Sequence, residues 1–325
     1  MKAIFLGGVA ADTAAGIKDE LPRGLEVEIL NDPIERARLP NAAAEAEILV
    51  SNHWRADYPP APKLRLVQSV ATGVELFDLA ALPKGLAICN AFGHETAIAE
   101  YIVMVMLVLH HRLFEISGEF REHGSWQTSW VQSGKPHGEV RGTTLGIVGY
   151  GRVGREVARR AAPLGCRILA ANRTPREPEA GVERVYPLAE LDHMLPECDT
   201  VALCTALGPE TTGLIDARRL KLMKPDTFLI NISRGQVIDE DAIYAALRDR
   251  TIAGAALDVW WQYPDPSEPE RRGSRHPFHE LPNVILTPHN SGWTSGMVRR
   301  RWEEIADNIG RFFRGEALIN LVTRT

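Results

Sequence analysis

Cysteine is scarce in this chain of 325 residues, and an excess of positive charge is lacking. The 4 cysteines form no CxxC pair, which excludes a disulfide framework and favours a reducing compartment. We therefore expect a cytoplasmic protein. Lys and Arg total 37 against 42 Asp and Glu, giving a net charge of -5. The chain lacks the basic excess that binding to nucleic acid or an anionic membrane requires, so neither is an expected partner.

Long hydrophobic runs are also lacking. The strongest apolar run covers residues 101–109, well short of the ~20 residues that a membrane helix needs. We interpret it as part of a buried helix. The apolar start of the chain is interrupted by Gly7, Gly8 and Asp12, which indicates a strand and its turn rather than a signal peptide.

What the chain does have is the composition of a globular protein, with 45% hydrophobic and 24% charged residues. The length suggests roughly two domains, at about 150 residues per domain. Short apolar runs alternate with helix-length segments, which predicts parallel α/β sheets. Expected strands cover 2–6, 27–30, 48–51, 64–70, 87–90, 145–149, 167–171, 200–204, 227–232, 252–257 and 284–287. Expected helices lie within 7–24 and over 96–118, 155–164 and 295–313, and expected loops cover 126–137 and 263–282.

A glycine motif opens the second α/β series. Gly149-Tyr-Gly-Arg-Val-Gly154 follows an apolar strand and begins a helix, which is the context that a dinucleotide-binding GxGxxG requires. Gly149 would allow the tight turn, Gly151 the approach of a pyrophosphate, and Gly154 close packing of helix and strand. The helix N-terminus would face the anion.

The end of the next strand predicts which dinucleotide binds. An NAD-binding unit has Asp or Glu about 20 residues after the motif, where it accepts from the ribose 2′-hydroxyl. Here neutral Asn172 is followed by Arg173, with Arg176 nearby. Because arginine binds phosphate and a carboxylate repels it, we expect NADP(H) to be preferred, with NAD(H) as the other possible cofactor. The alternative is that Arg173 stacks on adenine or points to solvent.

Three further segments place a polar residue directly after an apolar strand: Arg234, Asp258 and His289. The carboxyl edge of a parallel sheet is where ligands bind. With the glycine motif, this order resembles the D-isomer-specific 2-hydroxyacid dehydrogenase family, which includes glyoxylate and hydroxypyruvate reductases. Ala71-Thr-Gly-Val-Glu75 and Pro209-Glu-Thr-Thr-Gly-Leu-Ile215 add to the resemblance, which covers nearly the whole chain.

The resemblance implies a fold and an activity. A doubly wound Rossmann domain, residues 98–289, would be inserted in a flavodoxin-like substrate domain made of 1–97 and 290–325. The protein would transfer a hydride between NAD(P)H and a 2-keto acid or its D-2-hydroxy acid.

The resemblance also assigns roles to residues. Arg234 would grip the substrate carboxylate, and His289 would protonate the carbonyl oxygen. Asp258 would lie near the nicotinamide, and the amides of Thr72 and Gly73 would hold the substrate carboxylate from the other domain. The implied cofactor-binding residues are Thr96, Gly149, Gly151, Arg152, Val153, Gly154, Asn172, Arg173, Thr174, Thr205, Thr211, Ile232, Asp258 and His289.

One position departs from the family. Tyr263 stands where the family has the glutamate that pairs with the histidine, and Gln262 precedes it. Formate dehydrogenases carry a glutamine at that point, so either side chain could face His289. Both are neutral, and neither would raise the histidine pKa as a carboxylate does. We expect a proton donor that works at lower pH, or a substrate with its own acidic group. A dinucleotide-sensing protein without catalysis and a dehydrogenase of formate are the alternatives.

Tryptophans bear on substrate size and assembly. Trp54 lies on a loop that contacts the substrate in the family and would make the pocket bulky, and Trp293 would line the same pocket. The segment with Trp126 and Trp130 resembles one that reaches a neighbouring subunit's active site in hydroxypyruvate reductases, which predicts a homodimer. His110 and His111 are adjacent in an expected helix and point in different directions, and His276 and His279 lack Cys or acidic partners at ligand spacing, so we expect no metal site.

Overall fold

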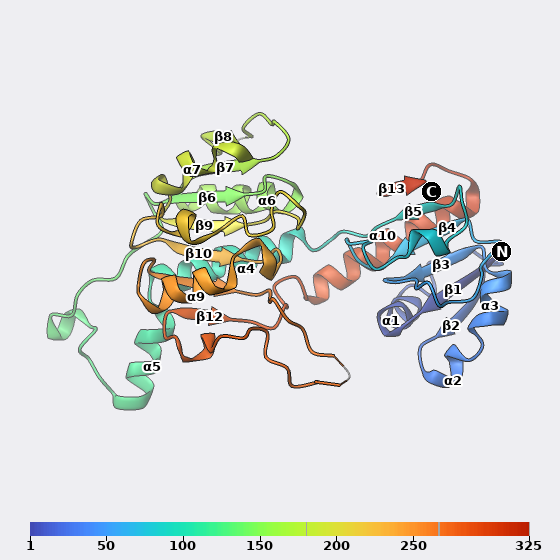
Figure 1. The fold of residues 1–325 in the computed structure, drawn as a ribbon, viewed down its shortest axis with the longest axis horizontal. Helices are drawn as coiled ribbons and strands as arrows, with labels where there is room; N and C mark the ends of the chain where they lie inside the picture. The colour runs from blue at the N-terminus through green and yellow to red at the C-terminus, as the bar shows by residue number, and fades with distance from the viewer. Residues whose placement is uncertain (180, 266, 325) are drawn as a thin grey trace. The chain divides into compact units, whose positions relative to one another are not determined.

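The computed structural model describes residues 1–179, 181–265 and 267–324, and it consists of two compact units (Figure 1). Unit 1 is made of Met1–Gly93 and Ser295–Thr325. Unit 2 is His94–Thr294. The chain therefore leaves unit 1 after Gly93 and returns to it at Ser295.

Unit 1 is built on a sheet with the order β13-β5-β4-β3-β1-β2. Strands β1 to β5 are parallel, and β13 pairs antiparallel with β5. The order of the parallel strands is the flavodoxin-like one. The strands are β1 (Lys2–Leu6), β2 (Glu26–Leu30), β3 (Ile48–Ser51), β4 (Leu66–Ser69), β5 (Ala87–Cys89) and β13 (Leu321–Arg324). The helices are α1 (Gly8–Gly16), α2 (Pro33–Arg36), α3 (Leu39–Glu45) and α10 (Ser295–Arg314), with a short 3-10 turn at Leu79–Ala81.

Alternating side chains of these strands fill two cores. Ile4 and Leu6 of β1 pack with α3 on one face. Ala3 and Phe5 pack with α1 and α10 on the other. The period of two along a strand buries both faces, as expected of a parallel sheet between helices.

Unit 2 is built on a seven-stranded sheet with the order β12-β11-β10-β9-β6-β7-β8. All its neighbouring strands are parallel, in the doubly wound order of a Rossmann fold. The strands are β6 (Thr144–Val148), β7 (Arg167–Asn172), β8 (Arg184–Pro187), β9 (Thr200–Leu203), β10 (Phe228–Asn231), β11 (Gly254–Leu257) and β12 (Val284–Leu286). The helices are α4 (Glu95–His110), α5 (Leu113–His123), α6 (Arg152–Ala161), α7 (Leu191–Met194), α8 (Ala217–Leu220) and α9 (Glu240–Arg248). Short 3-10 turns cover Trp130–Gln132, Ala162–Leu164, Leu188–Glu190, Leu195–Glu197, Gly235–Val237 and Phe278–Glu280.

Two cores again flank the sheet. Leu145 and Ile147 of β6 pack with α4 and α6, whereas Val148 packs on the face covered by α7, α8 and α9. The strand order reverses between β6 and β9, and in open α/β sheets ligands bind at the carboxyl ends of the strands where the order reverses. The predicted α/β fold class is confirmed.

One expected helix was wrong. The segment 96–118 is not continuous but forms α4 and α5, which are bent by 58°. Arg112, between them, has φ 51°, a left-handed conformation that a continuous helix does not contain. Among the described residues no single helix is long and apolar enough to cross a membrane, although α4 and α5 together pass on length and composition alone.

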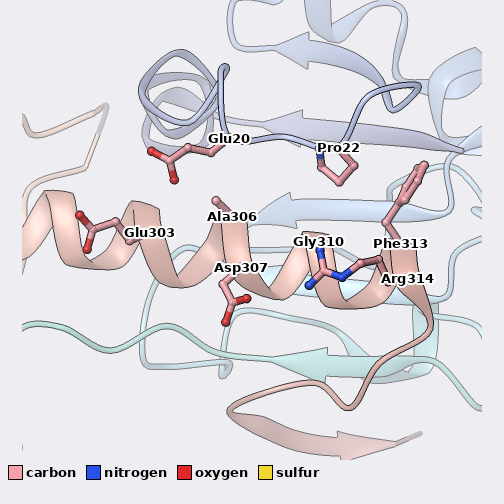
Figure 2. Close-up of a pocket in the computed structure, with 8 residues that line it drawn as sticks. All are labelled: Glu20, Pro22, Glu303, Ala306, Asp307, Gly310, Phe313 and Arg314. Carbon is pink, nitrogen blue, oxygen red and sulfur yellow. The ribbon is translucent and has the colours of Figure 1, made fainter.

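A cavity of about 490 Å³ lies in unit 1, against α10 (Figure 2). Three of its lining side chains are acidic, and none of the eight is a predicted site residue. They are Glu20, Pro22, Glu303, Ala306, Asp307, Gly310, Phe313 and Arg314.

Candidate active site

The glycine turn after β6 has positions at which a side chain would not fit. Gly149 has φ 101°, and a Cβ on it would lie 2.6 Å from the backbone nitrogen of Thr205. A Cβ on Gly154 would collide with the Gly149 carbonyl oxygen. A Cβ on Gly151, the N-cap of α6, would meet nothing within 4 Å. The helix N-terminus therefore opens onto free space, which fits a pyrophosphate.

The segment after β7, where the ribose of a dinucleotide is expected to bind, is held by hydrogen bonds of its own residues. We call this segment the ribose corner. Asn172 Oδ1 accepts the backbone N–H of Tyr150 at 3.0 Å, and its Nδ2 donates to the carbonyl oxygen of Thr174 at 2.7 Å. The Arg173 side chain is 78% exposed, with Nη1 3.8 Å from a carboxylate oxygen of Glu210. Both members of this ion pair are exposed, with Glu210 at 66%, and the residue that directly follows Asn172 is the cation.

Other predicted cofactor residues build the loops around the turn. The Thr211 hydroxyl donates to the Ala206 carbonyl at 2.7 Å and accepts from the Gly208 amide at 2.8 Å. The backbone of Thr205 lies against Gly149. Ile232, 7% exposed, follows β10. These residues lie on loops or ends of β6, β9 and β10, which are neighbours in the sheet.

The first turn of α6 faces α4. The Thr96 hydroxyl, on the first turn of α4, donates to Glu156 at 3.2 Å. Arg152 lies 3.9 Å from Glu95. Val153, next to Arg152, packs on the core shared by these helices.

His289 lies in the turn after β12, next to Tyr263. The Tyr263 hydroxyl is 2.9 Å from His289 Nδ1, and the ring centroids are 5.6 Å apart. Gln262 instead is exposed and donates its backbone N–H to the Gly273 carbonyl at 3.0 Å. Of the two side chains considered from the sequence, the structure brings Tyr263 to the histidine.

The electrostatics of this pair differ from those of a histidine and a carboxylate. Burial lowers the pKa of His289; Asp258 raises it and Arg234 lowers it further, each by a smaller effect. Burial raises the pKa of Tyr263, so the phenol stays neutral near pH 7. The partner of Nδ1 therefore supplies a hydrogen bond without a compensating charge.

Arg234 leaves β10 on a turn fixed by Asn231. The Asn231 Nδ2 donates to the Arg234 carbonyl oxygen at 3.0 Å, and Asn231 Oδ1 accepts from the Ser233 backbone N–H at 3.0 Å. Arg234 Nη1 donates to the Ser233 carbonyl oxygen at 2.7 Å, and the positive charge of Arg234 lowers the pKa of both Tyr263 and His289. A guanidinium beside a histidine at this edge can bind a carboxylate while the imidazole exchanges a proton.

Asp258 is fully buried and binds the histidine turn. Its Oδ1 accepts from the Thr287 hydroxyl at 2.6 Å and the Asn290 backbone N–H at 2.9 Å, and its Oδ2 accepts from the Ser291 backbone N–H at 3.0 Å. His289, between these donors, has φ 57°, a left-handed conformation that costs about 1–2 kcal/mol for a residue with a side chain. The sequence motif contains Thr287, but nothing in it indicated this bond.

The unit 1 residues form a turn of their own. The Thr72 hydroxyl donates to the Ala91 carbonyl oxygen at 3.0 Å, and the Asn90 amide donates to the Thr72 carbonyl oxygen at 2.8 Å. A Cβ on Gly73 would collide with the carboxylate of Glu75. The turn is therefore held by these two hydrogen bonds, and the exposed Glu75 carboxylate lies over Gly73.

Trp54 requires a correction. It was expected to line a substrate pocket, but its side chain is 1% exposed and packs in the core of unit 1 with Tyr58. The indole buries more apolar area there than a surface position allows. The other predicted tryptophans are on the surface: Trp126 is 50%, Trp130 88% and Trp293 63% exposed. Among residues 1–179, 181–265 and 267–324, no group of three or more His, Cys, Asp or Glu could hold a metal ion.

Comparisons with known proteins give the family. The model of the D-isomer specific 2-hydroxyacid dehydrogenase NAD binding domain matches residues 103–291. A glyoxylate reductase of Korarchaeum cryptofilum is 35% identical over 94% of this chain and 88% of its own. A glycerate dehydrogenase of Methylorubrum extorquens is 32% identical over 83% of this chain and 84% of its own.

A solved structure from Aeromonas salmonicida, described as a D-isomer specific 2-hydroxyacid dehydrogenase family protein, has a TM-score of 0.82 and 27% identity, and covers 100% of this chain and 99% of its own. The resemblance seen in the motifs is confirmed. The chain belongs to the D-isomer specific 2-hydroxyacid dehydrogenase family, and is an oxidoreductase that transfers a hydride with a nicotinamide cofactor.

Proposed function

We propose that this protein is an NADP(H)-preferring reductase of small 2-keto acids such as glyoxylate or hydroxypyruvate. The observation that carries the proposal is the grouping of Arg234 and the Tyr263–His289 pair after strands of the sheet that also bears the glycine turn. The names of the glyoxylate reductase and glycerate dehydrogenase relatives support the substrate class.

Each side chain then has a defined task. A nicotinamide cofactor, when bound, would supply the hydride to the carbonyl carbon. Arg234 binds the substrate carboxylate through its planar guanidinium and polarises the adjacent carbonyl. His289 gives the proton of Nε2 to the carbonyl oxygen, while Tyr263 holds Nδ1 and so fixes the ring. In the oxidative direction, His289 accepts that proton. Thr72 and Gly73 are proposed to bind the same carboxylate through their amides.

The preference for NADP(H) is supported by Arg173. A 2′-phosphate needs a cation that can reach it, and this guanidinium is exposed beside the ribose corner. Asn172 has an amide in place of the carboxylate that would accept from a 2′-hydroxyl, and both ends of that amide already bond to the backbone. The remaining predicted cofactor residues are proposed to bind through the loops described above.

A homodimer is proposed on the exposed apolar side chains of one segment. The helix α5 and the residues after it project from the rest of unit 2 (Figure 1). Phe114, Phe120 and Trp130 there are 63%, 49% and 88% exposed, and apolar side chains gathered on a surface mark protein contacts. Sedimentation of the wild type and of Trp130→Ser tests this. A dimer that becomes a monomer is expected, and a monomeric wild type would overturn it.

The function is tested by initial rates with a panel of 2-keto acids and both reduced cofactors. Oxidation of NADPH with glyoxylate or hydroxypyruvate, at a kcat/KM above that for NADH, is expected. Binding of the dinucleotide without turnover of any acid would favour a sensing role instead. Reduction of NAD(P)+ by formate in place of keto acid turnover would favour the formate alternative.

A further inference from the structure

We infer that Tyr101 is a positioning residue for the reaction, acting on His289 through a chain of hydrogen bonds formed by Thr287 and Asp258. The inference rests on the proposed role of His289 as the proton donor. It concerns a residue of α4, far from the histidine in the sequence.

The chain of bonds has a single direction. Asp258 accepts from the Thr287 hydroxyl at 2.6 Å, so the Thr287 hydrogen is already used. The Tyr101 hydroxyl, 2.7 Å from the Thr287 oxygen, must then be the donor of that bond. Protons therefore point from Tyr101 to Thr287 to the Asp258 carboxylate, and each bond polarises the next.

Every polar group of Thr287 is engaged. Its backbone N–H donates to the Leu257 carbonyl at 3.0 Å, and its carbonyl accepts the indole N–H of Trp260 at 2.9 Å. Its hydroxyl lies between Tyr101 and Asp258. His289 lies two residues after Thr287. The backbone amides of the next two residues, Asn290 and Ser291, also donate to Asp258. The turn is thus held on both sides of the histidine.

We call the bonds of Tyr101, Thr287 and Asp258 around the histidine turn the clamp. The backbone of His289 shows why the turn needs it. Its φ of 57° is one that a residue with a side chain adopts only when its surroundings impose it. Tyr101, on α4, is 8% exposed and packs in the core that α4 and α6 form with the sheet, so its hydroxyl has a fixed position. Loss of that hydroxyl leaves the Thr287 oxygen and, through it, the carboxylate less well held.

The test is a set of conservative variants measured in the full-length protein. Tyr101→Phe keeps the ring and removes the hydroxyl. We expect kcat for keto acid reduction to fall about tenfold, the effect of one hydrogen bond, with the cofactor Kd and the substrate KM within twofold of wild type. Thr287→Val should lose more, and Thr287→Ser, which keeps the hydroxyl, should restore most of that loss.

The double variant gives the sharpest outcome. If Tyr101 acts through Thr287, Tyr101→Phe has no further effect on kcat once Thr287→Val is present. If the loss of kcat in the double variant instead equals the product of the losses in the two single variants, the inference is overturned. Tyr186→Phe is the matched control, since its hydroxyl also donates within unit 2, to Glu197 at 2.9 Å, at the edge strand β8. Its kcat should stay at the wild-type value.

A readout independent of turnover separates this inference from the proposed function. The side-chain nitrogen and carbon resonances of His289 should change in Tyr101→Phe and stay unchanged in Tyr186→Phe. Unchanged His289 resonances and kcat in Tyr101→Phe would overturn the clamp even if the enzyme reduces keto acids. A wild type without any keto acid reduction would overturn the proposed function, and the resonances would still report on the clamp.

Discussion

The turn after β6 and the turn after β12 both belong to the candidate active site, but their shapes are fixed in different ways. Both follow strands of one parallel sheet. The first, at Gly149 to Gly154, takes its shape from missing side chains, since a Cβ at either glycine would strike nearby backbone. The second, around His289, takes its shape from side chains far apart in the sequence, namely Tyr101, Asp258 and Tyr263. A local motif can encode the first turn, but only the folded unit can assemble the second.

The largest expected effect breaks the histidine turn chemically. His289→Gln keeps a polar side chain but cannot donate a proton as an acid, so kcat for reduction should fall by about 10²–10⁴. Steady-state kinetics with NADPH and glyoxylate measure it. The dinucleotide Kd should change far less than kcat, because the glycine turn is intact. His279→Gln, which alters an exposed histidine bonded to Arg272, is the control, and an equal loss there would count against the assignment.

A smaller effect sharpens the role of the neutral partner. Tyr263→Glu places a carboxylate where the phenol now lies 2.9 Å from Nδ1, and an opposite charge that close raises a histidine pKa by about 1–3 units. Because the imidazolium is the donor, reduction should persist to higher pH in this variant. At alkaline pH its rate, relative to its own maximum, should exceed that of the wild type by about tenfold or more. Tyr263→Phe, of similar shape without charge, should not gain this range. Equal pH profiles for the two variants would contradict the argument.

The glycine turn can be tested with a matched pair of alanines. Gly154→Ala puts a Cβ against the Gly149 carbonyl oxygen, so it should destabilise the fold by about 1–3 kcal/mol, as overpacking does. Gly151→Ala meets nothing within 4 Å and has φ -89°, open to any residue. It should unfold at the wild-type temperature yet bind the dinucleotide about tenfold more weakly, or ~1.4 kcal/mol. Calorimetry and fluorescence titration check both, and tight binding by Gly151→Ala would refute the pyrophosphate position.

The narrowest effect, confined to one of the two cofactors, concerns the ribose corner. Arg173→Ala should raise the KM for NADPH by about tenfold, in line with one charge-assisted hydrogen bond, and leave that for NADH unchanged. Arg176→Ala measures the share of the neighbouring arginine. A parallel loss with both cofactors would mean that Arg173 contacts the adenine instead.

These differences explain what the sequence could predict. Except for β8 and β13, which were not expected, the strands of both sheets follow from apolar runs and were found within a few residues, and the glycine turn follows from a short motif. The break between α4 and α5 depends on one left-handed residue, Arg112, within an otherwise helical pattern. The edge strand β8 is short and polar at its start, so periodicity gave no signal for it.

Site residues divide in the same way. Arg234 and His289 stand in motifs that carry their roles, so they could be named in advance. The choice between Gln262 and Tyr263 needed the loop that ends at Gly273, whose carbonyl holds Gln262 by its backbone. Trp54 was misplaced because a loop position gives no information on burial, and the indole packs inward.

The measurement that tests the central claim most directly is the pH dependence of wild-type kcat/KM for keto acid reduction, since kcat/KM reports the pKa values of the free enzyme. His289 must be protonated to act, and its pKa is lowered from the ordinary value of 6.5 mainly by burial. The rate should therefore be highest at acidic pH and fall as pH rises through a value below 6.5. A rate that stays at its maximum well above pH 6.5 would contradict a histidine donor with a neutral tyrosine partner.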